Sequence, residues 1–234
     1  MNLPQHIAII PDGNRRWAKR RGLVSFLGHQ KGADAAEKIL ETALDLKIPY
    51  ITFWLCSINN LTKRNGKEVK FLHKVFGIYF RRLLKNKKIH KEGVRVRILG
   101  RWQKYLPENL KNLFEEIEAK TKDYKNFQLT FLLAYSGIDE MTTAIQRIAE
   151  LRIKNSELRI DENLIKNNLW TKDLPPVDLV IRTGGEPHNS NGFMMWDTAD
   201  SQFYFTETLW PDFSPEEFKK AVSIYQKIER RLGK

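Results

Sequence analysis

Short apolar runs alternate with longer segments of helical period along the whole chain, and this alternation constrains the fold more than any other feature. The runs that we expect to be strands are residues 6–10, 50–55, 94–99, 129–133, 179–182 and 203–205. The segments between them predict helices at 33–46, 68–84, 107–119, 140–151, 162–169 and 215–232. Alternating strands and helices predict an α/β fold built on a parallel sheet.

Chain length and composition indicate one folded unit. With 234 residues, 41% of them hydrophobic, the chain can bury one sizeable core, and no linker divides it, so we expect a single domain over residues 1–234. The one cysteine, Cys56, fits a reducing cytoplasm and is expected to be a buried small hydrophobe. No apolar stretch reaches the roughly 18 residues of a membrane span, and a signal-peptide pattern is absent, so we expect a soluble, cytoplasmic protein.

The chain is strongly basic, with 40 Lys and Arg residues against 28 Asp and Glu, a net charge of +12. This balance indicates acidic partners, which are diphosphates, nucleic acid or an anionic membrane face. The densest basic run, residues 81–91, has no interleaved aromatic platform and resembles no nucleic-acid-binding motif. We therefore expect a solvated helix end there and no nucleic-acid partner, with a weak membrane-surface association left open.

Residues 178–186 place an arginine and two glycines at the end of an apolar strand. Arg182 supplies a planar fork for phosphate oxygens, and Gly184 and Gly185 let backbone N–H groups approach an anion. This pattern indicates a phosphate site. A strand followed by an ordinary turn is the alternative, and this segment alone does not decide between them.

Residues 6–10 lead in the same way into a tight turn, Pro-Asp-Gly-Asn at 11–14. Its N–H groups and Arg16 are placed to hold a diphosphate while Asp12 holds a bridging divalent cation; the alternative is a turn whose aspartate caps the next helix. In parallel sheets, ligands bind at the carboxyl ends of the strands. Asp12, Ser57 and Arg182 each follow a strand directly, so we expect them at one edge of the sheet.

The ordered motifs resemble those of the cis-prenyltransferases, the family typified by undecaprenyl diphosphate synthase. The matching segments are 6–18 (family pattern H-x-A-x-I-M-D-G-N-G-R-W-A), 28–32, 57–63, 134–137, 178–191, 204–206, 209–213 and 231–233. The resemblance implies a central parallel sheet of about six strands flanked by helices, with an apolar tunnel between sheet and helices for the growing chain. It also implies a homodimer.

In this family an allylic diphosphate ionises, the π bond of isopentenyl diphosphate attacks its carbon, and a proton is then lost. The resemblance implies Mg²⁺ at Asp12, while Ser57 and Asn60 orient the alkene and assist proton removal. Arg182 and Ser190 would bind the second, homoallylic diphosphate, and 231–233 would reach the partner's site. The implied substrate-binding residues are Gly13, Asn14, Arg15, Arg16, Trp17, His29, Lys63, Arg182, His188, Ser190, Arg231 and Gly233.

Several positions depart from the family pattern, and they cluster at this site. Arg15 stands where a glycine is usual, and Ser25 stands where an arginine is usual. The segment E-N-W-x-R-P reads Asn-Asn-Leu-Thr-Lys-Arg at 59–64, so Lys63 keeps the charge of the family arginine but loses its planar fork. His188 replaces another arginine.

The metal-binding pattern departs as well. After an inserted Gly192, the glutamate that the family uses as a metal ligand is Gln202, and a neutral amide binds Mg²⁺ more weakly than a carboxylate. Asp197 or Asp200 are the candidates to compensate, and alternation along an extended chain puts only Asp200 on the same face as Gln202.

These departures leave the phosphate-binding residues in place and alter the acceptor half of the site. We expect an active prenyltransferase that makes a short or irregular, non-head-to-tail product. Leu55 stands where a small residue is usual, and four aromatic residues are expected to crowd the tunnel: Phe71, Phe76, Tyr79 and Phe80. The alternatives are a regular long-chain, undecaprenyl-type synthase and a non-catalytic subunit that supports a partner synthase.

Overall fold

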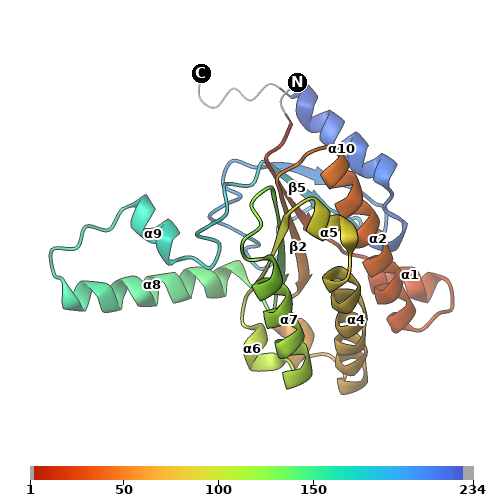
Figure 1. Cartoon of the computed structure of the whole chain (residues 1–234), viewed down its shortest axis with the longest axis horizontal. Coiled ribbons are helices and arrows are strands. Elements are labelled where there is room, and N and C mark those ends of the chain that lie inside the picture. The colour runs from red at the N-terminus through yellow and green to blue at the C-terminus, as the bar shows by residue number, and fades with distance from the viewer. Residues whose placement is uncertain (1–2, 229–234) are drawn as a thin grey trace.

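The six expected strands form one parallel sheet in the computed structural model, which describes residues 3–228 (Figure 1). They are β1 His6–Ile10, β2 Tyr50–Cys56, β3 Val94–Leu99, β4 Phe127–Leu133, β5 Leu179–Arg182 and β6 Gln202–Phe205. Their order in the sheet is β3-β4-β2-β1-β5-β6, and each neighbouring pair is parallel. The predicted α/β class and parallel sheet are confirmed.

The helices confirm the predicted segments and add short ones. They are α1 Asn14–Arg20, α2 Ser25–Asp45, α3 Ile58–Thr62, α4 Gly66–Leu84, α5 Lys87–Lys91, α6 Trp102–Tyr105, α7 Glu108–Thr121, α8 Gly137–Lys154, α9 Glu162–Asn168 and α10 Pro215–Lys227, with a 3-10 turn, η1, at Trp210–Asp212. Helices α3, α5 and α6 were not predicted, because a segment of four or five residues is too short to show a helical period. Helix α10 ends at Lys227, short of the predicted residue 232.

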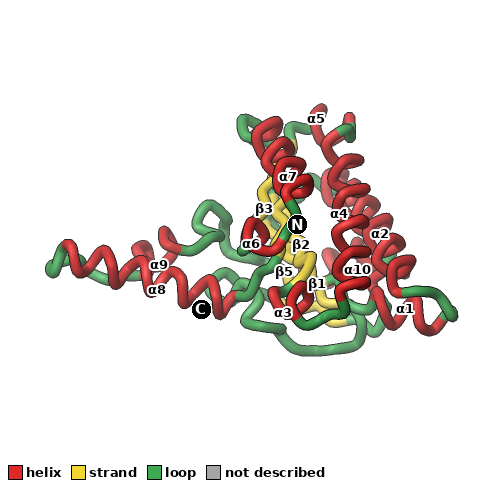
Figure 2. Tube along the Cα trace, turned by 90° about the horizontal axis from the view of Figure 1, so that it is seen from below, coloured by secondary structure: helices red, strands yellow, loops and turns green. Residues whose placement is uncertain are grey.

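Both faces of the sheet are buried, and strand β1 shows how. Ile7 and Ile9 belong to the core under helices α2, α4, α7 and α10, whereas Ala8 and Ile10 belong to a second core on the opposite face. Loop residues such as Phe193 supply much of that second core. Helices α8 and α9 extend sideways from the body instead of lying flat on the sheet (Figures 1 and 2).

Helix α2 begins at Ser25, before the predicted residue 33, and its extra turns pack against α1. A Cβ atom at Gly28 would lie 2.1 Å from the backbone oxygen of Asn14, and one at Gly32 would lie 2.0 Å from Asn14 Oδ1. Glycine is unfavourable inside a helix, which is why the local pattern predicted a later start. The close approach to Asn14 explains why glycine is present at both positions.

No helix within residues 3–228 is long and apolar enough to cross a membrane. The predicted site residues Arg231 and Gly233 lie outside the described residues.

Candidate active site

A polar pocket of about 450 Å³ lies beyond the carboxyl ends of β1, β2 and β5. The predicted site residues that line it are Asp12, Gly13, Asn14, Arg15, Arg16, His29, Ser57, Asn60, Arg182 and Ser190. Asp12, Ser57 and Arg182 therefore meet at one edge of the sheet, as the strand-end rule predicted.

Two arginines hold the carboxylate of Asp12 at the centre of this pocket. Arg182 Nη2 lies 3.4 Å from Asp12 Oδ2, and Arg16 Nη2 lies 3.4 Å from Asp12 Oδ1. Glu186 contacts the same two nitrogen atoms, at 3.2 Å from Arg182 and 3.8 Å from Arg16. Among the described residues, buried Arg182 Nε and Arg16 Nη2 have no hydrogen-bond partner. Guanidinium nitrogen atoms without a hydrogen-bond partner suit an anionic ligand.

The loop after β1 has a conformation that requires glycine. Gly13 has a φ of 113° and is the N-cap of α1, with no side-chain hydrogen bond at this cap. The alternative reading, in which Asp12 caps the helix, is therefore wrong. Asn14 Nδ2 donates to the Pro11 carbonyl at 3.1 Å, while its buried Oδ1 has no hydrogen-bond partner among the described residues. The Asp12 carboxylate is thus left to face the pocket.

Ser57 and Asn60 form the N-terminal cap of α3. Ser57 Oγ accepts a hydrogen bond from the Asn60 backbone N–H at 3.2 Å, and the Ser57 N–H donates to Asn60 Oδ1 at 3.1 Å. This reciprocal pair is a capping box. It fixes both side chains at the pocket wall next to β2, which gives these two residues a structural role independent of any role in proton removal.

A cluster around Glu68 forms another wall of the pocket, and sequence reasoning missed its centre. Glu68 Oε1 lies 3.0 Å from Arg64 Nη1, 3.9 Å from Arg15 Nε and 4.0 Å from His29 Nε2. Burial, reinforced by the positive charges of Arg64 and Arg15, lowers the pKa of His29 from 6.5 to about 4. His29 is therefore neutral at pH 7.

Arg64 lines the pocket, whereas Lys63 is exposed and does not line it. Both residues follow the end of α3, so the sequence had no signal that chose between them. Arg64 and Arg15 are two guanidinium groups that the family pattern does not place here. Ser25 and Lys63, at the positions where the family pattern has arginines, do not line this pocket.

Besides Lys63, two further predicted substrate-binding residues, Trp17 and His188, do not line the pocket. Trp17 Nε1 donates to Asp212 Oδ1 at 2.7 Å, and the Arg21 guanidinium lies over the Trp17 ring. His188 has an exposed side chain, but its backbone carbonyl accepts a hydrogen bond from Arg182 Nη1 at 2.6 Å. His188 thus positions Arg182 through its main chain.

The candidate replacements for the metal-ligand glutamate lie away from Asp12. Gln202 is the first residue of β6 and pairs with Leu179, the first residue of β5, whereas the pocket lies beyond the opposite ends of the strands. Asp200 lies two residues before this strand and is exposed. Asp197 is buried in an ion pair with Lys166. Neither Gln202 nor these two aspartates line the pocket of this chain.

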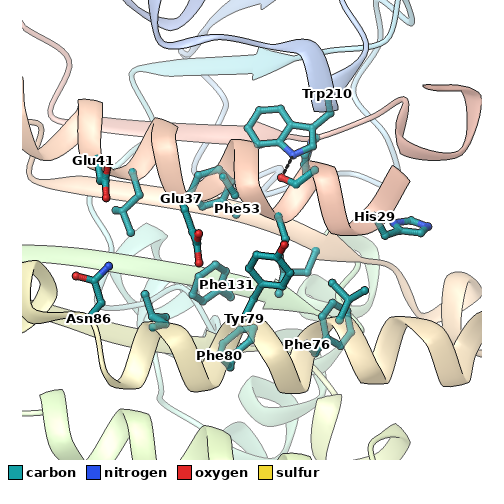
Figure 3. Close-up of a pocket in the computed structure, with 18 of the residues that line it drawn as sticks. His29, Glu37, Glu41, Phe53, Phe76, Tyr79, Phe80, Asn86, Phe131 and Trp210 are labelled. Atoms are coloured by element: carbon teal, nitrogen blue, oxygen red, sulfur yellow. Dashed lines mark hydrogen bonds between the residues drawn. The ribbon is translucent and has the colours of Figure 1, made fainter. Parts of the chain in front are cut away.

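A second, apolar cavity of about 130 Å³ lies between α2 and α4, over β2 and β4. Phe53, Phe76, Tyr79, Phe80 and Phe131 surround it, with His29 at one end and Glu41 and Asn86 at the other (Figure 3). Phe71, which was also expected to line this space, is instead 46% exposed. The residues shared with the polar pocket are Pro11, Asn14, His29 and Leu55.

A basic pocket at the strand ends that adjoins an apolar cavity suits a ligand that joins an anionic group to a hydrocarbon chain. Residues 10–233 match a family model described as "Putative undecaprenyl diphosphate synthase". The isoprenyl transferase of Aquifex aeolicus is 41% identical over 100% of this chain and 97% of its own length.

Two further comparisons agree. A geranylgeranyl-diphosphate-specific tritrans,polycis-undecaprenyl-diphosphate synthase of Pyrococcus abyssi is 39% identical over 99% of this chain and 88% of its own. The crystal structure of lavandulyl diphosphate synthase from Lavandula x intermedia, in complex with dimethylallyl diphosphate, matches with a TM-score of 0.91 at 31% identity, covering 99% of each chain. The chain belongs to the undecaprenyl diphosphate synthase family, the cis-prenyltransferases, and is a prenyltransferase.

Proposed function

We propose that this prenyltransferase condenses an allylic diphosphate with isopentenyl diphosphate, releases diphosphate, and makes a short prenyl product. The observation that carries this proposal is the contact between the two cavities. The polar pocket suits the diphosphate and the apolar cavity suits the hydrocarbon, and His29 and Leu55 line both. One substrate can therefore occupy both cavities at once.

The allylic diphosphate binds, in this proposal, to the loop after β1 and to the cations around it. The first residues of α1, among them Arg15 and Arg16, line the same pocket as Arg64. These donors stabilise the charge that develops on the leaving group. Departure of this group is the step with the largest barrier in the reaction. Arg182 and Ser190 hold the second diphosphate, and Arg182 is fixed for this role by its bond to the His188 carbonyl.

Asp12 is the residue that would hold Mg²⁺. Mg²⁺ commonly binds one or two carboxylates together with substrate phosphate oxygens and water, and Asp12 presents one carboxylate to the pocket. Within residues 3–228, no group of three His, Cys, Asp or Glu side chains could hold a metal ion. Phosphate oxygens would therefore have to complete the ligand set. When bound, the ion would neutralise charge on the departing diphosphate.

The size of the apolar cavity supports a short product. Its volume of about 130 Å³ is close to the roughly 150 Å³ of an engineered apolar cavity that holds one benzene molecule, so it has room for about one five-carbon unit. Leu55 stands where the two cavities meet, at a position where the family usually has a small residue. Its side chain takes up space beside the hydrocarbon that a smaller residue would leave free.

A homodimer is part of this proposal, and two exposed apolar surfaces support it. Phe203 and Phe205 on the edge strand β6 are 40% and 38% exposed and stack on each other. Ile145 and Ile153 on the protruding helix α8 are 61% and 85% exposed. A second copy of the chain would cover such surfaces, and the family resemblance places residues 231–233 of one copy at the site of the other. Light scattering of the wild type and of the variant Phe203→Ser/Phe205→Ser checks this.

Activity is tested with the purified protein. Labelled dimethylallyl, geranyl or farnesyl diphosphate is incubated with and without isopentenyl diphosphate and with and without Mg²⁺, and the products are identified by mass spectrometry. We expect short head-to-tail products that require both substrates and Mg²⁺. The variant Asp12→Asn is the control, and it should lose at least about a hundredfold in kcat because it lacks the carboxylate.

Other outcomes distinguish the alternatives. Product from dimethylallyl diphosphate alone would favour irregular coupling of two allylic units, which the altered segment 59–64 and the similarity to a lavandulyl diphosphate synthase support. Polymers of undecaprenyl length would refute the short-product proposal. Turnover that appears solely on addition of a second protein would favour a supporting subunit.

A further inference from the structure

Four large apolar side chains are exposed where the α1–α2 turn adjoins the start of α4. Leu23, Val24 and Leu27 are 40%, 64% and 38% exposed, and Phe71 is 46% exposed. Phe26 connects the two segments, because its ring lies 5.5 Å from that of Phe71. We call these four exposed residues the apolar tip.

Cations flank the apolar tip on both segments. Their placement follows from helix spacing, which puts Lys31 on the same side of α2 as Leu27, and Lys67 and Lys74 on the same side of α4 as Phe71. Lys74 Nζ also lies 5.8 Å from the centre of the Phe26 ring. The exposed cations of this surface are Lys19, Arg20, Lys31, Lys67, Lys70 and Lys74.

Acidic groups are scarce around this surface. No Asp or Glu occurs between Asp12 and Asp34, and between Asp45 and Glu92 there is just Glu68, whose carboxylate pairs with Arg64 in the pocket. From η1, Asp212 faces the end of α1, where it pairs with Arg21 at 3.0 Å. The surface is thus apolar at its centre and positively charged around it, a combination that suits an anionic lipid surface.

The apolar tip is carried by the same helices that form the two substrate cavities. Helices α2 and α4, which carry Leu27 and Phe71, are the two helices that enclose the apolar cavity. Helix α1, which leads into the tip, begins with pocket residues Asn14 and Arg15. Figures 1 and 2 both place α1 on the side of the molecule opposite the protruding α8 and α9, so α1 is remote from α8, one of the two surfaces proposed for dimerisation.

We propose that the apolar tip and its surrounding cations form a docking surface for an anionic membrane, with the tip side chains entering the headgroup region. This assigns membrane contact to the α1–α2 turn and the start of α4, and not to the basic run at 81–91. Docking would hold the ends of the cavity-forming helices against the lipid phase, where apolar prenyl chains collect.

The test is co-sedimentation of the full chain with vesicles of phosphatidylcholine, with and without phosphatidylglycerol. The charge variant is Lys19→Gln/Arg20→Gln, and the apolar variant is Leu23→Ser/Val24→Ser. The matched control, Lys87→Gln/Lys91→Gln on α5, removes the same charge from the basic run at 81–91. Melting temperature and turnover of a water-soluble allylic diphosphate in the absence of vesicles should match wild type in all three variants.

We expect binding that requires phosphatidylglycerol. The charge variant should bind about 30-fold more weakly, because each cation near an anionic surface contributes about a factor of five. The apolar variant should bind at least about tenfold more weakly, and the control should bind like the wild type.

Equal loss in the control, or no loss in the apolar variant, would overturn the proposal in favour of unspecific attraction by a basic protein. Tighter binding to duplex DNA than to vesicles, with no effect of the apolar variant, would instead assign the surface to nucleic acid. Because binding is measured without substrate, none of these outcomes depends on the proposed reaction.

Discussion

The substitution Leu55→Ala tests most directly how product length is set. Leu55 lines both the polar pocket and the apolar cavity of about 130 Å³, and removing its branched end widens the space where the two meet. Each buried methylene contributes about 0.8 kcal/mol, so a five-carbon unit that fits gains on the order of 4 kcal/mol. We therefore expect the product distribution of Leu55→Ala to shift towards longer chains by at least one unit.

The assay compares products of wild type and variant after dephosphorylation, by reversed-phase chromatography with mass detection. Leu→Ala substitutions at fully buried positions cost about 2–5 kcal/mol of unfolding free energy. The cost should lie near the lower limit here, because Leu55 is half-buried. Leu46→Ala is the matched control, since Leu46 also packs against the core but lines neither cavity. An unchanged product length in a folded, active Leu55→Ala protein would refute the idea that this side chain limits the product.

Three further predictions concern the site and the core. Arg64→Gln should raise KM for the allylic diphosphate about tenfold to a hundredfold, the value of a charged hydrogen bond, whereas Lys63→Gln should change it little; steady-state kinetics on both variants decide this. Gly32→Ala should lose activity or lower the melting temperature, because its Cβ would lie 2.0 Å from Asn14 Oδ1, and activity like that of wild type at an unchanged melting temperature would contradict the observed packing. Burial lowers the pKa of His6 from 6.5 to about 4. The unfolded chain therefore binds more protons in that range, and the folded state should lose up to about 3 kcal/mol as the pH falls from 6.5 to 4. Urea unfolding of wild type and His6→Asn should show this pH dependence in the wild type and less of it in the variant.

The elements that could be predicted are those whose signal is local. Strands such as β1 and β5 were located to the residue because their apolar runs end in turn residues. Ligand sites in parallel sheets lie at the carboxyl ends of the strands. The directions of β1 and β5 were therefore enough to predict Asp12 and Arg182 at one edge of the sheet. Helix α2 was predicted too short, because Gly28 and Gly32 weaken a helix locally and are required by contact with Asn14, which is distant in sequence from Gly32.

The sequence by itself determined the α/β class, the strand ends and the family, because periodicity, turn residues and ordered motifs are properties of neighbouring residues. Tertiary structure decided which side chains enter the pocket. It placed Arg64 there rather than Lys63, turned Trp17 towards Asp212, and put Gln202 at the far end of its strand. The positions of these side chains depend on contacts between segments that are far apart in the sequence. A local sequence pattern does not contain the free energy of such contacts.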